Sequence, residues 1–336
     1  MTQPAEKLDS SAPIHPTTLM RTGARLRLAY RSDLGALYQG NCLDLLGSLP
    51  SGSVDMIFAD PPFNLGKNYG PGITDEMKAH EYLDWSREWL GECVRLLTPG
   101  GALLVFNLPR WLIDYGAYLN GAGMEFRHWI AMRMPKAYPR GQRMSPAHYG
   151  CLYYTKGQPR VFHKVYVPIE TCRHCGGEIR DYGGHRKALN ERGINLMDVF
   201  NAPEDAWENA PEPMPPGEGW TDAEDMWADI PPVRHNRYKL RGANALAPIM
   251  LERLVAMASQ PGDLVLDPFA GTGTTFYAAE KLHRRWIGAE LGDTAPAINR
   301  LTDLAQGNHE RWESARGVTR RIKPRTPKRG QLPSEP

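Results

Sequence analysis

An acidic residue, two prolines and an aromatic residue follow one another at Asp60, Pro61, Pro62 and Phe63, at the end of the hydrophobic run VDMIFAD. This run has the length and composition of a buried strand. Parallel sheets bind their ligands at the carboxyl ends of the strands. Each proline ring also fixes a backbone φ angle. The four residues therefore predict an acid on a rigid backbone at the active edge of a sheet.

A second candidate site follows the short hydrophobic strand 264–267, which ends at Asp267. Gly271 and Gly273 form a turn there, and a helix is predicted from Thr274 onward. Glycine lets a backbone approach a ligand closely, and the N–H groups of a helix N-terminus favour a carboxylate or phosphate. On the glycines alone, a plain tight turn is an equally good interpretation.

Three details narrow the choice of ligand for this second site. The segment lacks the Gly-Lys-Ser/Thr ending of a phosphate loop, and Phe276 occupies the place of the third glycine of a dinucleotide fingerprint. Glu290 ends the next predicted strand seventeen residues beyond Gly273, near the spacing at which such folds place a carboxylate on ribose hydroxyls. The pattern favours a ligand with a ribose and a small anion but no pyrophosphate, a description that S-adenosylmethionine meets.

The ordered pair DPPF (60–63) and DPFAGTGTT (267–275) resembles the beta group of DNA amino-methyltransferases. In that group the catalytic motif precedes the cofactor motif, and a target-recognition region lies between them. The resemblance covers residues 35–157 and 232–295, and implies an S-adenosylmethionine-dependent methyltransferase fold. This is an α/β fold with a doubly wound, mostly parallel sheet in permuted motif order, acting on duplex DNA.

The resemblance also implies a role for each matching residue. Asp60 would accept a hydrogen bond from the target amine, the Pro61 carbonyl would be the second acceptor within the motif that Pro62 completes, and Phe63 would stack on the extruded base. The implied cofactor residues are Asp267, Phe269, Gly271, Thr272, Gly273, Thr274, Thr275 and Glu290.

Two stretches depart from the family pattern. Asn41 and Cys42 match the adenine-binding turn, but the family usually has an acid where Asn41 stands. The stretch GANALAP (242–248) replaces a common His-Pro-x-Lys-like sequence, so its cofactor contacts do not carry over.

The chemistry follows from the amine. The lone pair of an exocyclic amine is delocalised into the ring, and two rigid acceptors would draw that amine toward tetrahedral geometry. A base in a duplex must be flipped out to reach such a pocket, so we expect Phe63 to face the substrate rather than the core. The acid at position 60 favours transfer to N6 of adenine. N4 of cytosine is the alternative, RNA is a weaker substrate candidate, and a catalytically inert DNA-binding protein on the same fold is a remote one.

Alternating strands and helices must position these residues. A helix is predicted within 80–98, with Leu83, Leu90, Val94 and Leu97 on its buried face, stopped by Pro99-Gly100-Gly101. The other predicted elements are strands at 36–41, 102–106, 150–157 and 285–291 and helices at 42–50, 247–260 and 274–283. The predicted organisation is a disordered leader (1–23), a catalytic half (24–132), an irregular target-recognition insertion (133–243), a cofactor-binding half (244–308) and a basic, disordered tail (309–336).

The insertion is where DNA sequence would be read. Its candidate base or phosphate contacts are Arg133, Lys136, Arg140, Arg143, Arg186, Lys187, Arg234, Arg237, Lys239 and Arg241, although solvated surface charge is the favoured interpretation of any single one. Cys172 and Cys175 form half of a structural zinc site, with two free thiols as the favoured alternative.

The bulk composition excludes several classes of protein. The chain has 336 residues, a net charge of +2 and five cysteines, too few for a disulfide framework. No apolar run could span a membrane, and residues 1–23 lack a signal-peptide core. We expect a cytoplasmic, nucleoid-associated protein of a bacterium or phage-infected cell, monomeric or homodimeric, with a cognate restriction endonuclease as a possible partner.

Overall fold

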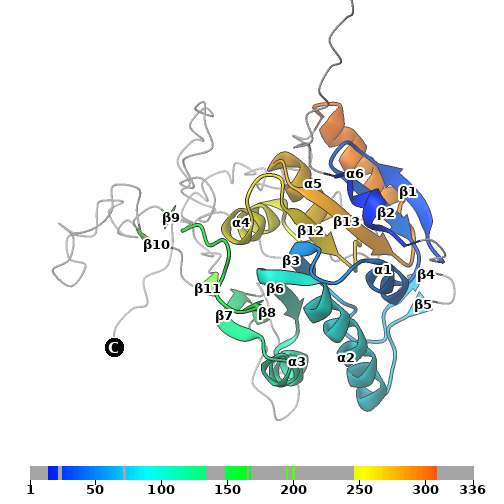
Figure 1. Ribbon diagram of the computed structural model, residues 1–336. Coiled ribbons are helices and arrows are strands. Elements are labelled where there is room, and N and C mark those ends of the chain that lie inside the picture. Colours follow the sequence, from blue (N-terminus) through cyan, green and yellow to red (C-terminus); the bar gives the residue numbers. More distant parts are fainter. Residues whose placement is uncertain are drawn as a thin grey trace, which may run out of the picture.

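The computed structural model describes residues 14–21, 25–70, 73–133, 148–164, 166–167, 194–195, 199–200 and 246–308. Within them, nine strands form one sheet in the order β1-β2-β13-β12-β3-β6-β8-β7-β11 (Figure 1). The strands are β1 (Arg27–Arg31), β2 (Gly35–Gln39), β3 (Val54–Ala59), β6 (Leu97–Asn107), β7 (Glu125–Arg133), β8 (His148–Thr155), β11 (Val199–Phe200), β12 (Leu264–Asp267) and β13 (Arg285–Glu290). Two separate pairs are β4 (Asn68–Gly70) with β5 (Ile73–Thr74), and β9 (Tyr166–Val167) with β10 (Ile194–Asn195).

The five central strands β2, β13, β12, β3 and β6 run parallel to one another. β8 is antiparallel to both β6 and β7, and β1 is antiparallel to β2. The predicted doubly wound, mostly parallel α/β sheet is confirmed. β8 and β11 come from the segment 133–243, so this segment supplies strands to the sheet and is not wholly an insertion beside it.

Helices cover both faces of the sheet, as Figure 1 shows. They are α1 (Cys42–Ser48), α2 (Ala79–Leu96), α3 (Pro109–Gly121), α4 (Pro248–Ala258), α5 (Thr274–Lys281) and α6 (Ala295–Ala305), with a short 3-10 helix η1 (Pro16–Leu19) near the N-terminus. Leu45, Trp89 and Leu112 from α1, α2 and α3 share one buried cluster. Helices α4, α5 and α6 contribute to a second cluster on the other face. The chain therefore builds one hydrophobic layer on each side of the sheet.

The buried stripe of α2 differs from the predicted one. Leu90 is buried as expected, but Leu83 and Val94 are only half-buried. The residues that face the sheet are Tyr82, Ser86, Trp89, Leu90, Cys93 and Leu96. Large aromatic and small polar side chains complete the helical period here, whereas the prediction counted leucine and valine alone.

The Pro99-Gly100-Gly101 stretch does more than stop a helix. α2 ends at Leu96, and β6 begins at Leu97, so this stretch lies inside the strand. Gly100 has φ 75°, and a Cβ atom there would lie 2.7 Å from the Gln158 carbonyl oxygen and the Arg160 nitrogen. Only glycine therefore allows the chain after β8 to pack against this end of β6.

Part of the predicted N-terminal leader is ordered. His15 hydrogen-bonds the Ser32 carbonyl at 3.0 Å, the Arg21 N–H donates to the Ser48 carbonyl at 3.0 Å, and Arg285 donates to the Ile14 carbonyl at 2.9 Å. The prediction of a disordered leader over 1–23 is therefore wrong for residues 14–21. These long-range contacts, which local sequence does not reveal, tie the segment to the turn after β1, to α1 and to the start of β13.

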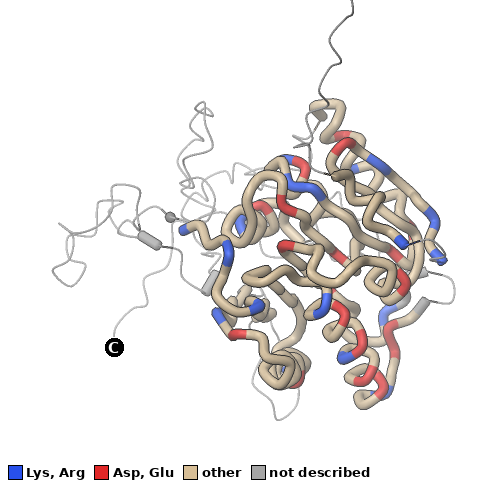
Figure 2. The backbone as a smooth tube through the Cα atoms, viewed as in Figure 1, with Lys and Arg blue, Asp and Glu red and all other residues tan. Residues whose placement is uncertain are grey.

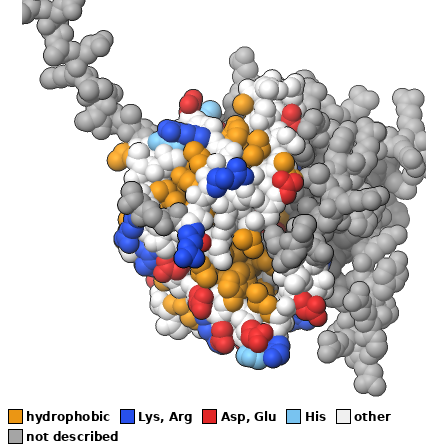
Figure 3. Space-filling model, turned by 90° about the vertical axis from the view of Figure 1, so that its right-hand side faces the viewer, with side chains coloured by type: hydrophobic (Ala, Val, Ile, Leu, Met, Phe, Trp, Pro, Cys, Tyr) orange, Lys and Arg blue, Asp and Glu red, His pale blue; other side chains and the backbone are white. Residues whose placement is uncertain are grey.

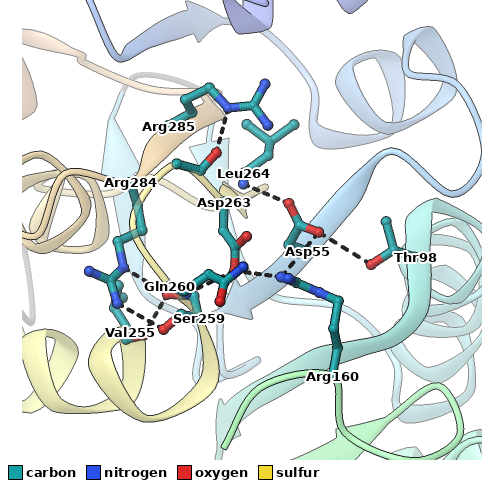
Figure 4. Close-up of polar contacts among 11 residues, drawn as sticks. Asp55, Thr98, Arg160, Val255, Ser259, Gln260, Asp263, Leu264, Arg284 and Arg285 are labelled. Carbon is teal, nitrogen blue, oxygen red and sulfur yellow. Dashed lines mark hydrogen bonds and ion pairs between the residues drawn. The ribbon is translucent and has the colours of Figure 1, made fainter. Parts of the chain in front are cut away.

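An ionic cluster joins the two halves of the fold at the amino ends of β3 and β12 (Figure 4). Arg160, just after β8, pairs with Asp55 of β3 at 3.3 Å and with Asp263, which precedes β12, at 2.5 Å. Asp55 also accepts the Leu264 N–H at 2.9 Å. The cluster holds β3 beside β12, although about 200 residues separate them in sequence.

Acidic and basic residues are interspersed over the described chain (Figure 2). The face shown in Figure 3 groups hydrophobic side chains near its centre, with charged residues around them. Among the residues that the structure describes, no helix combines the length and apolar character needed to cross a bilayer.

Candidate active site

Asp60 begins the loop that leaves the carboxyl end of β3, between the neighbouring strands β12 and β6. Its side chain is half-buried and accepts no hydrogen bond from any residue that the structure describes. Burial raises the pKa of Asp60 well above its usual range, the charge of Asp267 raises it further, and the nearby Lys67 opposes both. An acceptor kept away from water and without a donor favours a substrate group that brings N–H bonds.

The carbonyl groups of the same loop are not equivalent. The Tyr82 hydroxyl donates to the Pro62 carbonyl at 2.5 Å, and the Trp111 indole N–H donates to the Phe63 carbonyl at 3.0 Å. Within the described chain, the Pro61 carbonyl has no hydrogen-bond partner. Of the three carbonyls, the one expected to be an acceptor is thus the one left available.

Phe63 lies in the core, contrary to the expectation that it faces the substrate. Its side chain is only 7% exposed and packs between Phe106 and Tyr149, with ring centroids 5.9 and 5.8 Å away. The Lys67 ammonium lies 5.9 Å from the ring centroid. β6 and β8 bring these neighbours from positions 43 and 86 residues away in sequence, which local pattern could not reveal. Stacking on a base stays a prediction that this packing does not test.

The glycine turn joins β12 to α5, and Asp267 organises it. The Asp267 carboxylate accepts the Phe269 N–H at 2.9 Å and the Thr275 hydroxyl at 2.6 Å. It is 2% exposed, and burial raises its pKa to about 7 even though both hydrogen bonds lower it. Asp267 therefore fixes the conformation of the turn, because its carboxylate oxygens accept hydrogen bonds from the turn and from the start of α5.

Gly271 and Gly273 both require glycine's freedom, with φ values of 51° and 73°. A Cβ atom on Gly273 would also lie 2.8 Å from the Cβ atom of Ala297 on α6. Gly273 is the N-cap of α5, so the N–H groups of that helix begin directly after the turn. This geometry suits a small anion at the helix N-terminus.

The three threonines of the motif are buried under this turn. The Thr272 and Thr274 hydroxyls are 3.2 Å apart, and Thr274 also accepts from Arg300 of α6. Burial lowers the pKa of the Arg300 guanidinium to about 10. Arg300, which the sequence analysis did not identify, places a positive charge beside the N-terminus of α5.

Glu290 lies beside the turn at the end of β13. Its carboxylate accepts the Gly271 N–H at 2.7 Å and the Gly292 N–H at 2.8 Å. Burial raises its pKa, although these hydrogen bonds lower it. The structure thus brings the predicted ribose acid to the glycine turn, and each oxygen retains a lone pair for a ribose hydroxyl.

Asn41 and Cys42 lie at the start of α1, on the other side of β13. The Asn41 side chain caps α1 by accepting the Leu43 N–H at 2.9 Å, and the Gly40 N–H donates to the Glu290 carbonyl at 3.0 Å. Cys42 is buried, and burial raises the pKa of its thiol to about 12, which disfavours the reactive thiolate. Asn41 caps α1 beside Glu290, the predicted ribose acid, and its amide nitrogen is left to donate to a ligand.

Phe269 turns away from the glycine turn toward α2. Its ring makes edge contacts with Trp85 and Trp89, at centroid distances of 5.8 and 5.2 Å. The cofactor motif is thereby packed onto the helix that follows the catalytic motif.

Several predicted contacts fall outside the described residues. Cys172, Cys175 and every candidate base or phosphate contact except Arg133 lie there, and the side chain of Arg133 is not described. In the described ranges, no three metal-ligating side chains come together. The zinc site and the DNA-reading residues stay predictions.

A DNA methylase family model, N6_N4_Mtase, matches residues 54–298. Two curated relatives are the type II methyltransferase M.BamHI of Bacillus amyloliquefaciens, 43% identical over 81% of this chain, and the DNA adenine methyltransferase YhdJ of Escherichia coli strain K12, 27% identical over 93%. The match spans 58% of the length of M.BamHI and 97% of YhdJ. The solved PvuII DNA methyltransferase (cytosine-N4-specific) has a TM-score of 0.50 and 19% identity, covers 84% of this chain and 95% of its own, and shows the fold alone.

The family match confirms the resemblance drawn from the two motifs, and with it S-adenosylmethionine as the cofactor. The match begins at the first residue of β3 and ends within α6, so it includes both Asp60 and the glycine turn. The chain belongs to the N6/N4 DNA methylase family.

Proposed function

We propose that this chain transfers a methyl group from S-adenosylmethionine to the exocyclic amine of a base in duplex DNA. One observation carries the proposal: Asp60 and Asp267 lie at the carboxyl ends of the adjacent parallel strands β3 and β12, close enough for one charge to raise the pKa of the other. The catalytic acid and the cofactor turn thus share one edge of the sheet, as a direct transfer between two bound molecules requires.

Separate groups of described residues would bind the cofactor and orient the target amine. S-adenosylmethionine supplies an electrophilic methyl group on a sulfonium. The N–H groups at the start of α5 would hold its carboxylate, and Glu290 would hold its ribose. Asp60 and the Pro61 carbonyl would accept the two N–H bonds of the target amine and so orient its lone pair. The prolines hold these acceptors in place before the base arrives, which reduces reorganisation during the reaction.

Buried acids support a positively charged cofactor at this edge. Asp60, Asp267 and Glu290 all have a raised pKa because they are withdrawn from water. A nearby cation favours their charged forms and offsets the cost of their burial. The sulfonium and amino groups of S-adenosylmethionine are such cations.

For the base, we favour N6 of adenine, because an acid stands first in the tetrapeptide and YhdJ, named an adenine methyltransferase, aligns over almost its whole length. N4 of cytosine is the second candidate, because two acceptors at Asp60 and Pro61 serve either amine. The proposed partner is duplex DNA, and the proposed location is the cytoplasm, at the nucleoid. A cognate endonuclease, RNA as substrate, and a monomeric or homodimeric state stay predictions.

The test is incubation of the purified chain with S-adenosylmethionine and mixed-sequence duplex DNA, followed by nucleoside mass spectrometry and single-molecule mapping. N6-methyladenine at one short motif would support the full proposal. N4-methylcytosine would support the second candidate. Cofactor binding without any methylated base would refute DNA methylation and direct attention to RNA or to an inert fold.

A further inference from the structure

Most backbone angles of the catalytic loop are set by proline. The rings of Pro61 and Pro62 fix their own φ angles. A residue that precedes proline is held in the extended region, which restricts ψ of Asp60 and of Pro61. The first backbone angles that proline leaves open are ψ of Pro62 and the angles of Phe63. These angles decide whether the acceptors and the Phe63 ring keep their relative positions.

The structure places one donor on each of the open peptide groups. Tyr82 donates to the Pro62 carbonyl and Trp111 to the Phe63 carbonyl, at 2.5 and 3.0 Å. The two donors come from different helices, α2 and α3, and their rings pack together with centroids 4.7 Å apart. The rest of the loop conformation is therefore held from outside the loop.

The Tyr82 hydroxyl is itself oriented by a buried network. It accepts from the Asn107 amide at 3.0 Å and from the Tyr115 hydroxyl at 2.9 Å, while Ser86 lies 2.9 Å from Tyr115. Tyr82 and Tyr115 are 1% exposed, and Ser86 and Asn107 are fully buried. With two donors on its oxygen, the Tyr82 hydroxyl has its proton directed at Pro62.

Burial also keeps this proton in place. It raises the pKa of Tyr82 to about 12, so the hydroxyl is neutral and remains a donor at any pH at which the protein works. A purely apolar side chain could fill the same space without the cost of burying four polar groups. The network ends on the catalytic loop.

We infer that Tyr82 is a positioning residue for methyl transfer, an inference that rests on the proposed function. Its hydroxyl fixes the Pro62 peptide and so holds the Asp60 and Pro61 acceptors in position relative to Phe63. Tyr82 touches neither base nor cofactor and acts only through the loop.

The test compares Tyr82→Phe with Tyr115→Phe. Each variant removes one buried hydroxyl from the same network, but only the first removes the bond to the loop. The readouts are the single-turnover methylation rate on a duplex with the mapped motif and the dissociation constants for S-adenosylmethionine and that duplex. Thermal unfolding measures the stability lost in each variant.

We expect Tyr82→Phe to slow the single-turnover rate about ten-fold, the kinetic equivalent of one lost hydrogen bond, with both dissociation constants within about two-fold of wild type. Tyr115→Phe should lose similar thermal stability but stay within about three-fold of the wild-type rate, because the Tyr82 to Pro62 bond survives.

Equal rate losses in the two variants, or an unchanged rate in Tyr82→Phe, would overturn the inference. The proposed function would still stand in that case, provided that the wild-type protein methylates DNA. A wild-type protein without any transfer would instead overturn the proposed function, and this inference with it. If Tyr82→Phe does not fold, Trp111→Phe decides, because it removes the donor to the next carbonyl. A slower rate with unchanged affinities is again expected, and an unchanged rate would refute the positioning role.

Discussion

Asp267→Asn should make the unliganded protein more stable relative to wild type as the pH rises. The wild-type carboxyl is 2% exposed, and its pKa is raised from 3.8 to about 7 by burial. In the folded state it therefore keeps a proton that the unfolded chain has already released. The free energy of unfolding must fall as the pH rises from the unfolded pKa toward the folded one.

The magnitude follows from the shift. Three pKa units correspond to about 4 kcal/mol in total, of which about 2.5 kcal/mol is lost between pH 5 and pH 8. Asparagine preserves the turn, since its oxygen can accept the Phe269 N–H while its amide donates to the Thr275 oxygen. Loss of the Asp267 charge also lowers the pKa of Asp60, which changes the difference in the same direction.

Urea unfolding of both proteins at pH 5 and pH 8 would measure the effect, with the exposed Asp114→Asn on α3 as the control for loss of one carboxylate. Relative to Asp267→Asn, the wild type should lose about 2.5 kcal/mol of unfolding free energy between pH 5 and pH 8. A difference constant to within about 0.5 kcal/mol would show that the Asp267 carboxylate is solvated or paired, and would refute the reasoning.

Three further predictions test separate parts of the site. Asp60→Ala should abolish transfer with cofactor affinity within about two-fold of wild type, whereas Glu290→Ala should weaken cofactor binding about ten-fold or more; equal losses by calorimetry would contradict these roles. Arg160→Met should lower the unfolding free energy by about 2 kcal/mol, because two partly buried carboxylates lose their cation, whereas the exposed Arg87→Met should change it by less than about 0.5 kcal/mol; similar losses would remove any special role for the Arg160 cluster. DNA affinity should fall steeply as the salt concentration rises, because phosphate contacts release counterions; an affinity that does not change with salt in a binding titration would count against phosphate contacts from the insertion.

Local sequence predicted where the candidate functional residues lie, at the end of a strand or the start of a helix. Asp60 and Glu290 each follow a short hydrophobic run, and Gly273 precedes a helix; both the parallel sheet and the edge where they meet follow from the alternation of strands and helices. Their common location needs no long-range information, because parallel strands present their carboxyl ends together.

The residues that hold the catalytic loop could not be found in this way. Tyr82 and Trp111 lie 20 and 48 residues from the carbonyls to which they donate, on helical positions that pattern alone assigns to the core. The prediction for α2 placed Leu83 and Val94 on the buried face and so missed the stripe that begins at Tyr82. The burial of Phe63 was missed for the same reason, since β8 supplies Tyr149 from a segment whose composition indicated an insertion.

The two ends of the β3 and β12 pair have opposite electrostatics. At the amino ends, Arg160 neutralises Asp55 and Asp263, and the Asp55 carboxylate bonds the first residue of β12. At the carboxyl ends, Asp60 and Asp267 repel one another whenever both are charged. Strand pairing is thus stabilised where no chemistry is proposed, and the functional end can keep two like charges close together. The two strands come from distant parts of the chain, so their pairing depends on the backbone ladder between them, on the core and on this ionic cluster at the end opposite the candidate site.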